Sequence, residues 1–370
     1  MKTKIVLTCF CACSIPVFGQ DQTAESSTET LKEIAVEGTS IGEPNSSWSS
    51  ILQSESIESR QIYSLGDLNG LSPNLHLSGN GIKSFGDVLT MRGIGNTQFF
   101  GSPGVQLYVD GVPQGNVFTY STDLFDLEKI EILKGPQGSR FGKLAPGGAI
   151  NLITRKPGNE QSSEIAASYA TFDTQKYNLS SSDSLVEEFS YSLGVQRSIS
   201  DGFLNNSSGT NNDSESWNGR LTFHWDGGAG TKATLGASFT SHELGAQPLV
   251  LRNQSDFYAR SVDEDEFTEI DQNQQFLKLE HETELGTITS ITSRNDWDMN
   301  PNVLDGDLGV GNLFLPAPLD SLKFLKTTIS QDISEWTQYL AISGDEENDY
   351  NWSFGLFYED AEVKLSLIHI

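Results

Sequence analysis

The sequence predicts a small α/β domain followed by the first strands of an antiparallel transmembrane β-barrel. Three observations carry this prediction. Residues 51–157 combine a helical stretch with short apolar runs and end in a glycine-rich segment. After residue 157, apolar and polar residues alternate one by one, which is typical of strands with one apolar and one polar face. The connections between these strands alternate between short and long, as in outer-membrane barrels.

The first nineteen residues have the pattern of a secretory signal peptide. Two lysines precede an apolar run, and Val17-Phe18-Gly19 provides a small-residue cleavage site. All three cysteines of the chain lie inside this segment, at Cys9, Cys11 and Cys13. The mature chain is therefore expected to contain no disulfide. A lipoprotein cysteine at Cys13 is the alternative interpretation.

Charge divides the chain into two parts. Residues 44–158 carry nine Lys or Arg and nine Asp or Glu, whereas residues 159–370 carry eleven and thirty-five. This step predicts a domain boundary between Lys156 and Glu160. The excess of negative charge argues against nucleic acid as a partner. Because no later run of about 18 apolar residues occurs, any membrane crossing must be made by strands.

The alternating pattern predicts nine strands after residue 157. Their ranges are 163–172, 175–182, 188–199, 216–226, 231–242, 273–285, 287–297, 329–343 and 350–363. In a soluble sandwich the apolar faces would form a core, whereas in an outer-membrane barrel they would face lipid. The regular sorting of short and long connections favours the barrel. A bacterial barrel needs an even number of strands, so nine strands predict an incomplete barrel, and no strand is predicted for Leu365–Ile370.

The preceding domain, residues 51–157, is predicted to contain one helix and four strands. The helix is expected over Gln61–Leu71, and the strands near 88–92, 105–110, 128–133 and 149–154. Between the last two strands, five of the fourteen residues from Gly135 to Gly148 are glycine. Since glycine accepts positive φ and permits close backbone approach, this segment predicts compact turns between two buried strands.

Four short motifs resemble the plug domain of TonB-dependent outer-membrane receptors. They are Met91-Arg92-Gly93, the run from Leu107 to Gly111, the run from Glu131 to Pro136, and the run from Gly147 to Asn151. The resemblance implies an α/β plug domain at 51–157, followed at 158–370 by the first strands of an antiparallel transmembrane β-barrel that is still incomplete. It further implies a Gram-negative outer-membrane receptor that contacts lipid and takes up a ferric siderophore under the pull of the TonB complex of the inner membrane. No cofactor and no enzymatic activity are expected.

Residues 20–50 are polar and predict a flexible segment. Within it, Ile34 and Val36 alternate with small or polar residues, a pattern that suits strand addition to another protein. The resemblance identifies this island, within residues 31–37, as the TonB box, comprising Glu33, Ile34, Ala35, Val36 and Glu37. It also implies that Arg92 and Lys134 pair with glutamates on the inner barrel wall.

The resemblance places the ligand at three outward loops of the plug. The residues expected to bind it are Asn80, Lys83, Ser84 and Phe85 in the first loop, Gln98, Phe99 and Phe100 in the second, and Asn116, Phe118 and Tyr120 in the third. Aromatic faces, amides and a lysine together suit an anionic iron chelate. For the four rings at 99, 100, 118 and 120, packing against the barrel wall is the alternative.

Other classes of function find less support in the sequence. A phosphate loop would need Lys at position 148, where this chain has Gly. A calcium loop beginning at Asp298 would need Gly at position 303, where the chain has Val. No metal site and no catalytic constellation can be argued. The open alternatives are a soluble or surface β-sandwich binding module, a passive porin, and a receptor for another nutrient such as cobalamin or a glycan.

Overall fold

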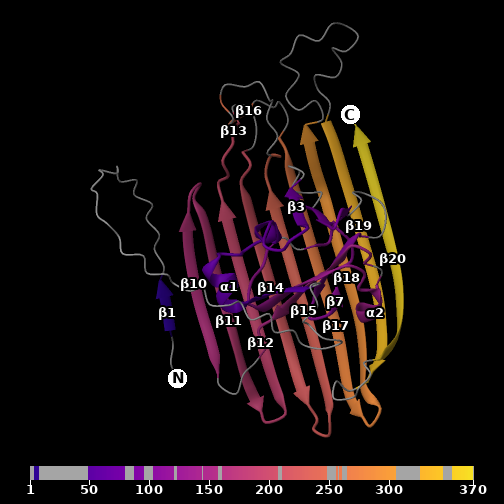
Figure 1. Cartoon of the computed structure of the whole chain (residues 1–370). Coiled ribbons are helices and arrows are strands. Elements are labelled where there is room, and N and C mark those ends of the chain that lie inside the picture. The colour runs from indigo at the N-terminus through magenta and orange to yellow at the C-terminus, as the bar shows by residue number, and fades with distance from the viewer. Residues whose placement is uncertain are drawn as a thin grey trace, which may run out of the picture.

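The computed structural model describes residues 4–7, 49–79, 87–95, 103–120, 123–143, 145–156, 161–206, 211–247, 256, 258–260, 265–305, 326–344 and 352–369. A small mixed domain lies against one face of a large sheet of long strands (Figure 1). Within the described residues, no helix has the length and apolar character that a membrane span requires. The fold class predicted from the sequence is confirmed.

The small domain, called the plug below, is built from two sheets and short helices. Its elements are β2 (Ser49–Gln53), α1 (Ser54–Ser59), η1 (Leu65–Leu68), β3 (Leu75–Gly79), β4 (Asp87–Met91), β5 (Ile94–Gly95), β6 (Val105–Val109), β7 (Val112–Pro113), β8 (Leu127–Lys134), α2 (Gly138–Phe141) and β9 (Gly148–Thr154). One sheet has the order β2-β8-β9-β6-β7 and the other the order β3-β4-β5. Their apolar side chains share one core, centred on Leu89, Leu107, Ile130 and Ile150.

The predicted helix over Gln61–Leu71 is wrong. The α-helix lies earlier, at α1, and only the 3₁₀ turn η1 forms within the predicted range. Gln61 adopts a left-handed backbone with φ 54°, which interrupts a helix at that point. Ser64 then starts a new turn, because the Asp67 carboxylate accepts hydrogen bonds from the Ser64 amide and hydroxyl.

The glycine-rich segment forms the expected turns between two buried antiparallel strands, β8 and β9. Gly148 opens β9 with φ +149°, and a Cβ at this position would lie 2.2 Å from Met91 Sδ and 2.3 Å from the Leu133 carbonyl oxygen. Only glycine fits here without displacing the neighbouring strand. The short helix α2 fills the middle of the segment.

The large sheet contains the nine predicted strands. They are β10 (Ser162–Ala170), β11 (Thr174–Val186), β12 (Phe189–Ser200), β14 (Ser214–Asp226), β15 (Thr231–Leu244), β17 (Phe267–Thr283), β18 (Gly286–Asp305), β19 (Lys326–Ser343) and β20 (Ser353–His369). They pair antiparallel in chain order, and β1 (Lys4–Leu7) adds parallel to β10 at one edge. Two short strands, β13 (Asn205–Asn206) and β16 (Ala259–Arg260), form a separate ladder.

Several strands are longer than the alternating pattern indicates. β17 begins at Phe267 and β18 continues to Asp305, because the β17–β18 ladder runs on past a register shift at Thr268/Ile270 and the β18–β19 ladder past one at Met299/Asn302. Each shift breaks the strict alternation that identifies a strand from sequence. The prediction that no strand covers Leu365–Ile370 is also wrong, since β20 pairs with β19 as far as His369. Ile370 lies outside the described residues.

The two faces of the large sheet differ as a barrel wall requires. Toward the plug lie buried polar side chains, including Gln196, Asn218, Gln274, Asn295 and Thr337. The opposite face carries exposed apolar side chains, including Leu179, Leu221, Leu235, Leu279 and Leu340. In a soluble sandwich the apolar face would be the buried one. The observed arrangement therefore supports a wall with lipid outside and the plug inside.

Candidate functional site

Most of the residues that the sequence predicted as a binding site lie outside the described residues. These are Asn80, Lys83, Ser84, Phe85, Gln98, Phe99 and Phe100 of the ligand loops, and Glu33, Ile34, Ala35, Val36 and Glu37 of the TonB box. The structure describes Asn116, Phe118 and Tyr120, together with Arg92 and Lys134. It also describes the seam between plug and barrel wall.

The third predicted loop is a compact turn that presses against the wall. The Asn116 side-chain oxygen accepts a hydrogen bond from the Phe118 amide at 2.9 Å, and the Thr119 hydroxyl bonds to the Gln114 carbonyl. Gly115 has φ +77°, and a Cβ there would lie 2.8 Å from Glu335 Oε2 on β19. The turn is thereby fixed in shape and presents Phe118 to the barrel.

Phe118 packs into an apolar patch on the inner wall, with its ring centroid 6.3 Å from that of Trp297. The patch consists of Ile270, Trp297, Met299, Ile329 and Ile333. Tyr120 instead belongs to the plug core, and its hydroxyl donates to the Val105 carbonyl at 3.0 Å. Since Phe118 and Tyr120 are only 8% and 5% exposed, their burial favours packing over ligand contact.

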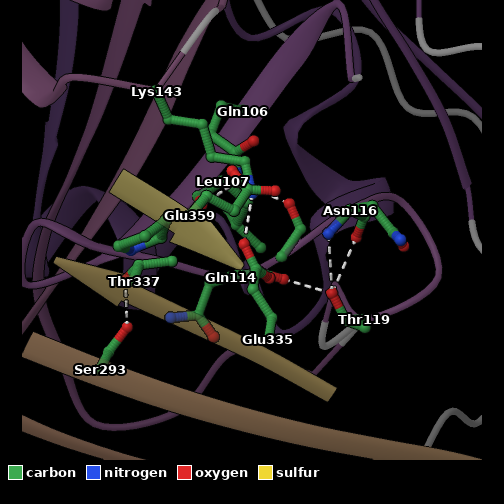
Figure 2. A network of polar contacts seen from close by, with 12 residues as sticks. Gln106, Leu107, Gln114, Asn116, Thr119, Lys143, Ser293, Glu335, Thr337 and Glu359 are labelled. Carbon is green, nitrogen blue, oxygen red and sulfur yellow. Dashed lines mark hydrogen bonds and ion pairs between the residues drawn. The ribbon is translucent and has the colours of Figure 1, made fainter. Parts of the chain in front are cut away.

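A buried cation on the plug holds the middle of the seam. Lys143 Nζ lies 2.5 Å from Glu335 Oε1 on β19 and 3.1 Å from Glu359 Oε2 on β20 (Figure 2). The side chains of Lys143 and Glu335 are 8% and 4% exposed. Removing one partner of such a buried pair leaves an uncompensated charge, so this contact anchors the glycine-rich segment to the wall.

The α2 segment, defined here as Gly138–Lys143, has three further contacts beside this ion pair. The Tyr339 hydroxyl of β19 donates to the Arg140 carbonyl at 2.9 Å. Phe141 stacks on Tyr108 of the plug core with ring centroids 4.2 Å apart. Gly142, at φ +78°, passes so close to β20 that a Cβ would lie 2.6 Å from Phe357 Cβ. The α2 segment is thus closely docked on β19 and β20.

Arg92 and Lys134 lie together at another part of the plug. Lys134 is buried, and its pKa is lowered by burial and by the nearby Arg92 guanidinium. The pairing of these two cations with glutamates of the inner wall stays a prediction. The buried plug–wall ion pair that the structure describes is made by Lys143 instead. The one signal of this pair in the sequence is an isolated lysine within the glycine-rich turns.

The opposite side of the plug contacts β12 and β14. Asp123 accepts hydrogen bonds from Ser216 and Asn218 at 3.1 and 3.0 Å. The Arg220 guanidinium lies 5.0 Å above the Phe125 ring. Burial raises the pKa of Asp126, and Arg155 and Arg220 oppose that rise. This loop, residues 123–126, forms a second docking point on the wall.

Between the plug and the inner ends of the strands lies a cavity of about 690 Å³. The plug contributes Arg140, Asn151 and Lys156, and the wall contributes His224, Lys278 and Tyr339, among others. Apolar side chains such as Phe141, Phe276 and Ile291 complete the lining, which is the mixture typical of small-molecule sites. In the described part of the chain, no three His, Cys, Asp or Glu side chains are grouped as a metal site would require.

Comparison with known proteins agrees with this architecture. The family model named TonB-dependent Receptor Plug Domain matches residues 43–149. Residues 43–149 are thus a plug domain of the TonB-dependent receptor type. Over 194 residues, the chain is 28% identical to the pesticin receptor of Yersinia pestis, a match covering 52% of this chain and 28% of the relative. Over 89 residues, it is 34% identical to the catecholate siderophore receptor Fiu of Escherichia coli K12, covering 24% of this chain and 10% of Fiu.

Solved receptors share the fold. The ferric yersiniabactin uptake receptor FyuA from Yersinia pestis superposes with a TM-score of 0.75 at 20% identity, over 87% of this chain and 49% of FyuA. The siderophore receptor PiuA from Acinetobacter baumannii gives a TM-score of 0.63 at 19% identity, over 86% and 46%. The receptor therefore spans about half the length of these structures. Its plug and strands have the architecture of an outer-membrane receptor.

Proposed function

We propose that this receptor imports a ferric siderophore across the outer membrane, driven by TonB. The observation that carries the proposal is the plug seated on the polar face of the β-wall and anchored there by a buried ion pair. A passive pore needs an open lumen, whereas a plugged wall needs work to open. The relatives named as catecholate siderophore and ferric yersiniabactin receptors support an iron chelate as the cargo.

In this proposal each part of the receptor has a separate task. The predicted ligand loops with Asn80, Lys83, Phe99 and Phe100 bind the chelate, and Asn116, a half-buried amide, is assigned to the same site. The TonB box at residues 33–37 receives the pull. Because β2 begins at Ser49 and pairs with β8, force on the preceding segment reaches the edge strand of the five-stranded plug sheet directly. No chemical change of the chelate is required.

Proline at position 34 should separate binding from transport. Ile34→Pro removes a backbone donor and fixes φ, so strand addition to TonB should fail while the distant loops remain unchanged. In the full-length receptor, expressed in an iron-restricted host without its own siderophore receptors, we expect the variant to lose uptake of ⁵⁵Fe-labelled catecholate and hydroxamate chelates. Binding to de-energised cells should be unchanged.

The matched control is Thr28→Pro, which places the same residue in the same segment outside the box. This variant should transport as the wild type does. Equal uptake by wild type and Ile34→Pro would refute the assignment of the TonB box. If the wild type takes up no iron chelate but does take up cobalamin or a glycan, the proposed siderophore cargo is wrong, whereas the proposed TonB-driven transport is retained.

A further inference from the structure

The inner face of β19 presents a graded series of contacts with the plug. From the outer end toward the inner end, it carries Ile329 and Ile333 under Phe118, then Glu335 bound to Lys143, then Tyr339 bound to Arg140. Below Tyr339 the wall is free of these contacts and borders the cavity. The inner face of β19 thus runs from the Phe118 contact to the cavity. Between these two points the α2 segment covers the strand.

The seam beside this closure contains buried polar atoms, on plug and wall, that find no hydrogen-bond partner within the described residues. They are the Tyr108 hydroxyl under Phe141, Gln106 Oε1 beside the Gly115 turn, and Asn295 Nδ2 on the facing wall. Such groups are costly to keep from water. Withdrawal of the α2 segment would hydrate them, which offsets part of the cost of breaking the Lys143 ion pair.

The docking point of residues 123–126 on β12 and β14 differs from that of the α2 segment in its contacts. There the Asp123 carboxylate is bonded to two wall side chains, although Arg220 Nη1 has no hydrogen-bond partner in the described residues. This point does not border the cavity through the Asp123–Asp126 loop. The two sides of the plug therefore differ in what their release would open.

We propose that the α2 segment is the gate of the receptor, that the passage runs along the inner face of β19, and that the cavity beneath is a transit site for the hydrated ferric chelate. This inference rests on the proposed function. The cavity has the volume of a small-molecule site. Its lining carries charges of both signs, with cations such as Lys156 and Lys278 next to carboxylates such as Asp110 and Glu280. Lys143, Tyr339 and Phe141 hold the gate closed.

Two engineered disulfides test the location of the passage. The pair Gly142→Cys and Phe357→Cys ties the gate to β20, since the two Cβ positions lie 2.6 Å apart and need a shift of only about 1 Å to reach disulfide geometry. The pair Asp126→Cys and Gly194→Cys ties the opposite side to β12, with Cβ positions 3.4 Å apart. With the native cysteines confined to the predicted signal peptide, no others compete.

With ⁵⁵Fe-labelled catecholate chelate as the probe, the tied gate should bind the chelate normally and lose at least nine-tenths of its uptake. A reductant should restore uptake. The protein with the Asp126→Cys and Gly194→Cys disulfide should transport at the same rate in its oxidised and reduced forms. Uptake through the tied gate, or equal loss in both tied proteins, would overturn the proposed passage. Failure of both reduced proteins and the wild type to take up any iron chelate would instead count against the proposed function.

Discussion

Replacing Lys143 by methionine should release the α2 segment from the barrel wall. The change leaves the Glu335 and Glu359 carboxylates without their cation, and removal of one partner from a buried pair costs about 3 to 5 kcal/mol. In hydrogen exchange of the receptor in outer membranes, residues 138–148 should lose protection by roughly a hundredfold or more. Protection in the α1 region should change little.

Two matched variants make this result specific. Lys364→Met removes a cation whose pair with Glu362 is exposed, at 65% and 66%, and should cost at most about 1 kcal/mol. Adding Glu335→Gln and Glu359→Gln to Lys143→Met should restore much of the protection, because no buried charge is then left unpaired. Unchanged exchange in Lys143→Met would show that the lysine is not an anchor.

Gly148→Ala should disrupt the plug itself. Its Cβ would stand 2.3 Å from the Leu133 carbonyl oxygen, a backbone atom that cannot move without displacing β8, and 2.2 Å from Met91 Sδ. Strained backbone and overpacking each cost about 1 to 3 kcal/mol. The variant should yield little folded receptor, and its plug should be cleaved rapidly in limited proteolysis.

Gly70→Ala separates the two causes of this loss. Gly70 also has a positive φ, +77°, but no atom lies within 4 Å of its would-be Cβ. This control should therefore bear the cost of backbone strain alone and keep a protease-resistant plug. Equal resistance of Gly148→Ala and wild type would contradict the close strand packing at the start of β9.

The strands of the wall could be predicted from sequence because burial is one-sided. One face of each strand points outward and the other points toward the plug. Apolar and polar residues must therefore alternate along the strand, as in β14 and β15. Where a bulge interrupts the ladder, as near Met299 and Asn302, the pattern breaks although the strand continues. The short helices of the plug lack any such periodic signal. The left-handed residue Gln61 ends the helical region before the predicted range, so the α-helix lies at α1 instead.

The candidate site could be predicted only in part, for a different reason. Position in the plug indicated which loops face outward, but contact across 192 residues of sequence, as between Lys143 and Glu335, leaves no local pattern. Burial likewise depends on the assembled seam. Phe118 and Tyr120 look alike in sequence, yet one packs on the wall and the other in the plug core.

The seating of the plug on the lumen face is the central claim, and one crosslinking measurement tests it most directly. Asp126→Cys paired with Gly194→Cys should form a disulfide in isolated outer membranes, detected as a linked peptide by mass spectrometry. Asp126→Cys paired with Val195→Cys should not, because Val195 is the next residue of β12 and its side chain points to the opposite face. Most of the first protein linked and little of the second is the expected result. No link in the first, or equal links in both, would show that the plug does not lie on this face.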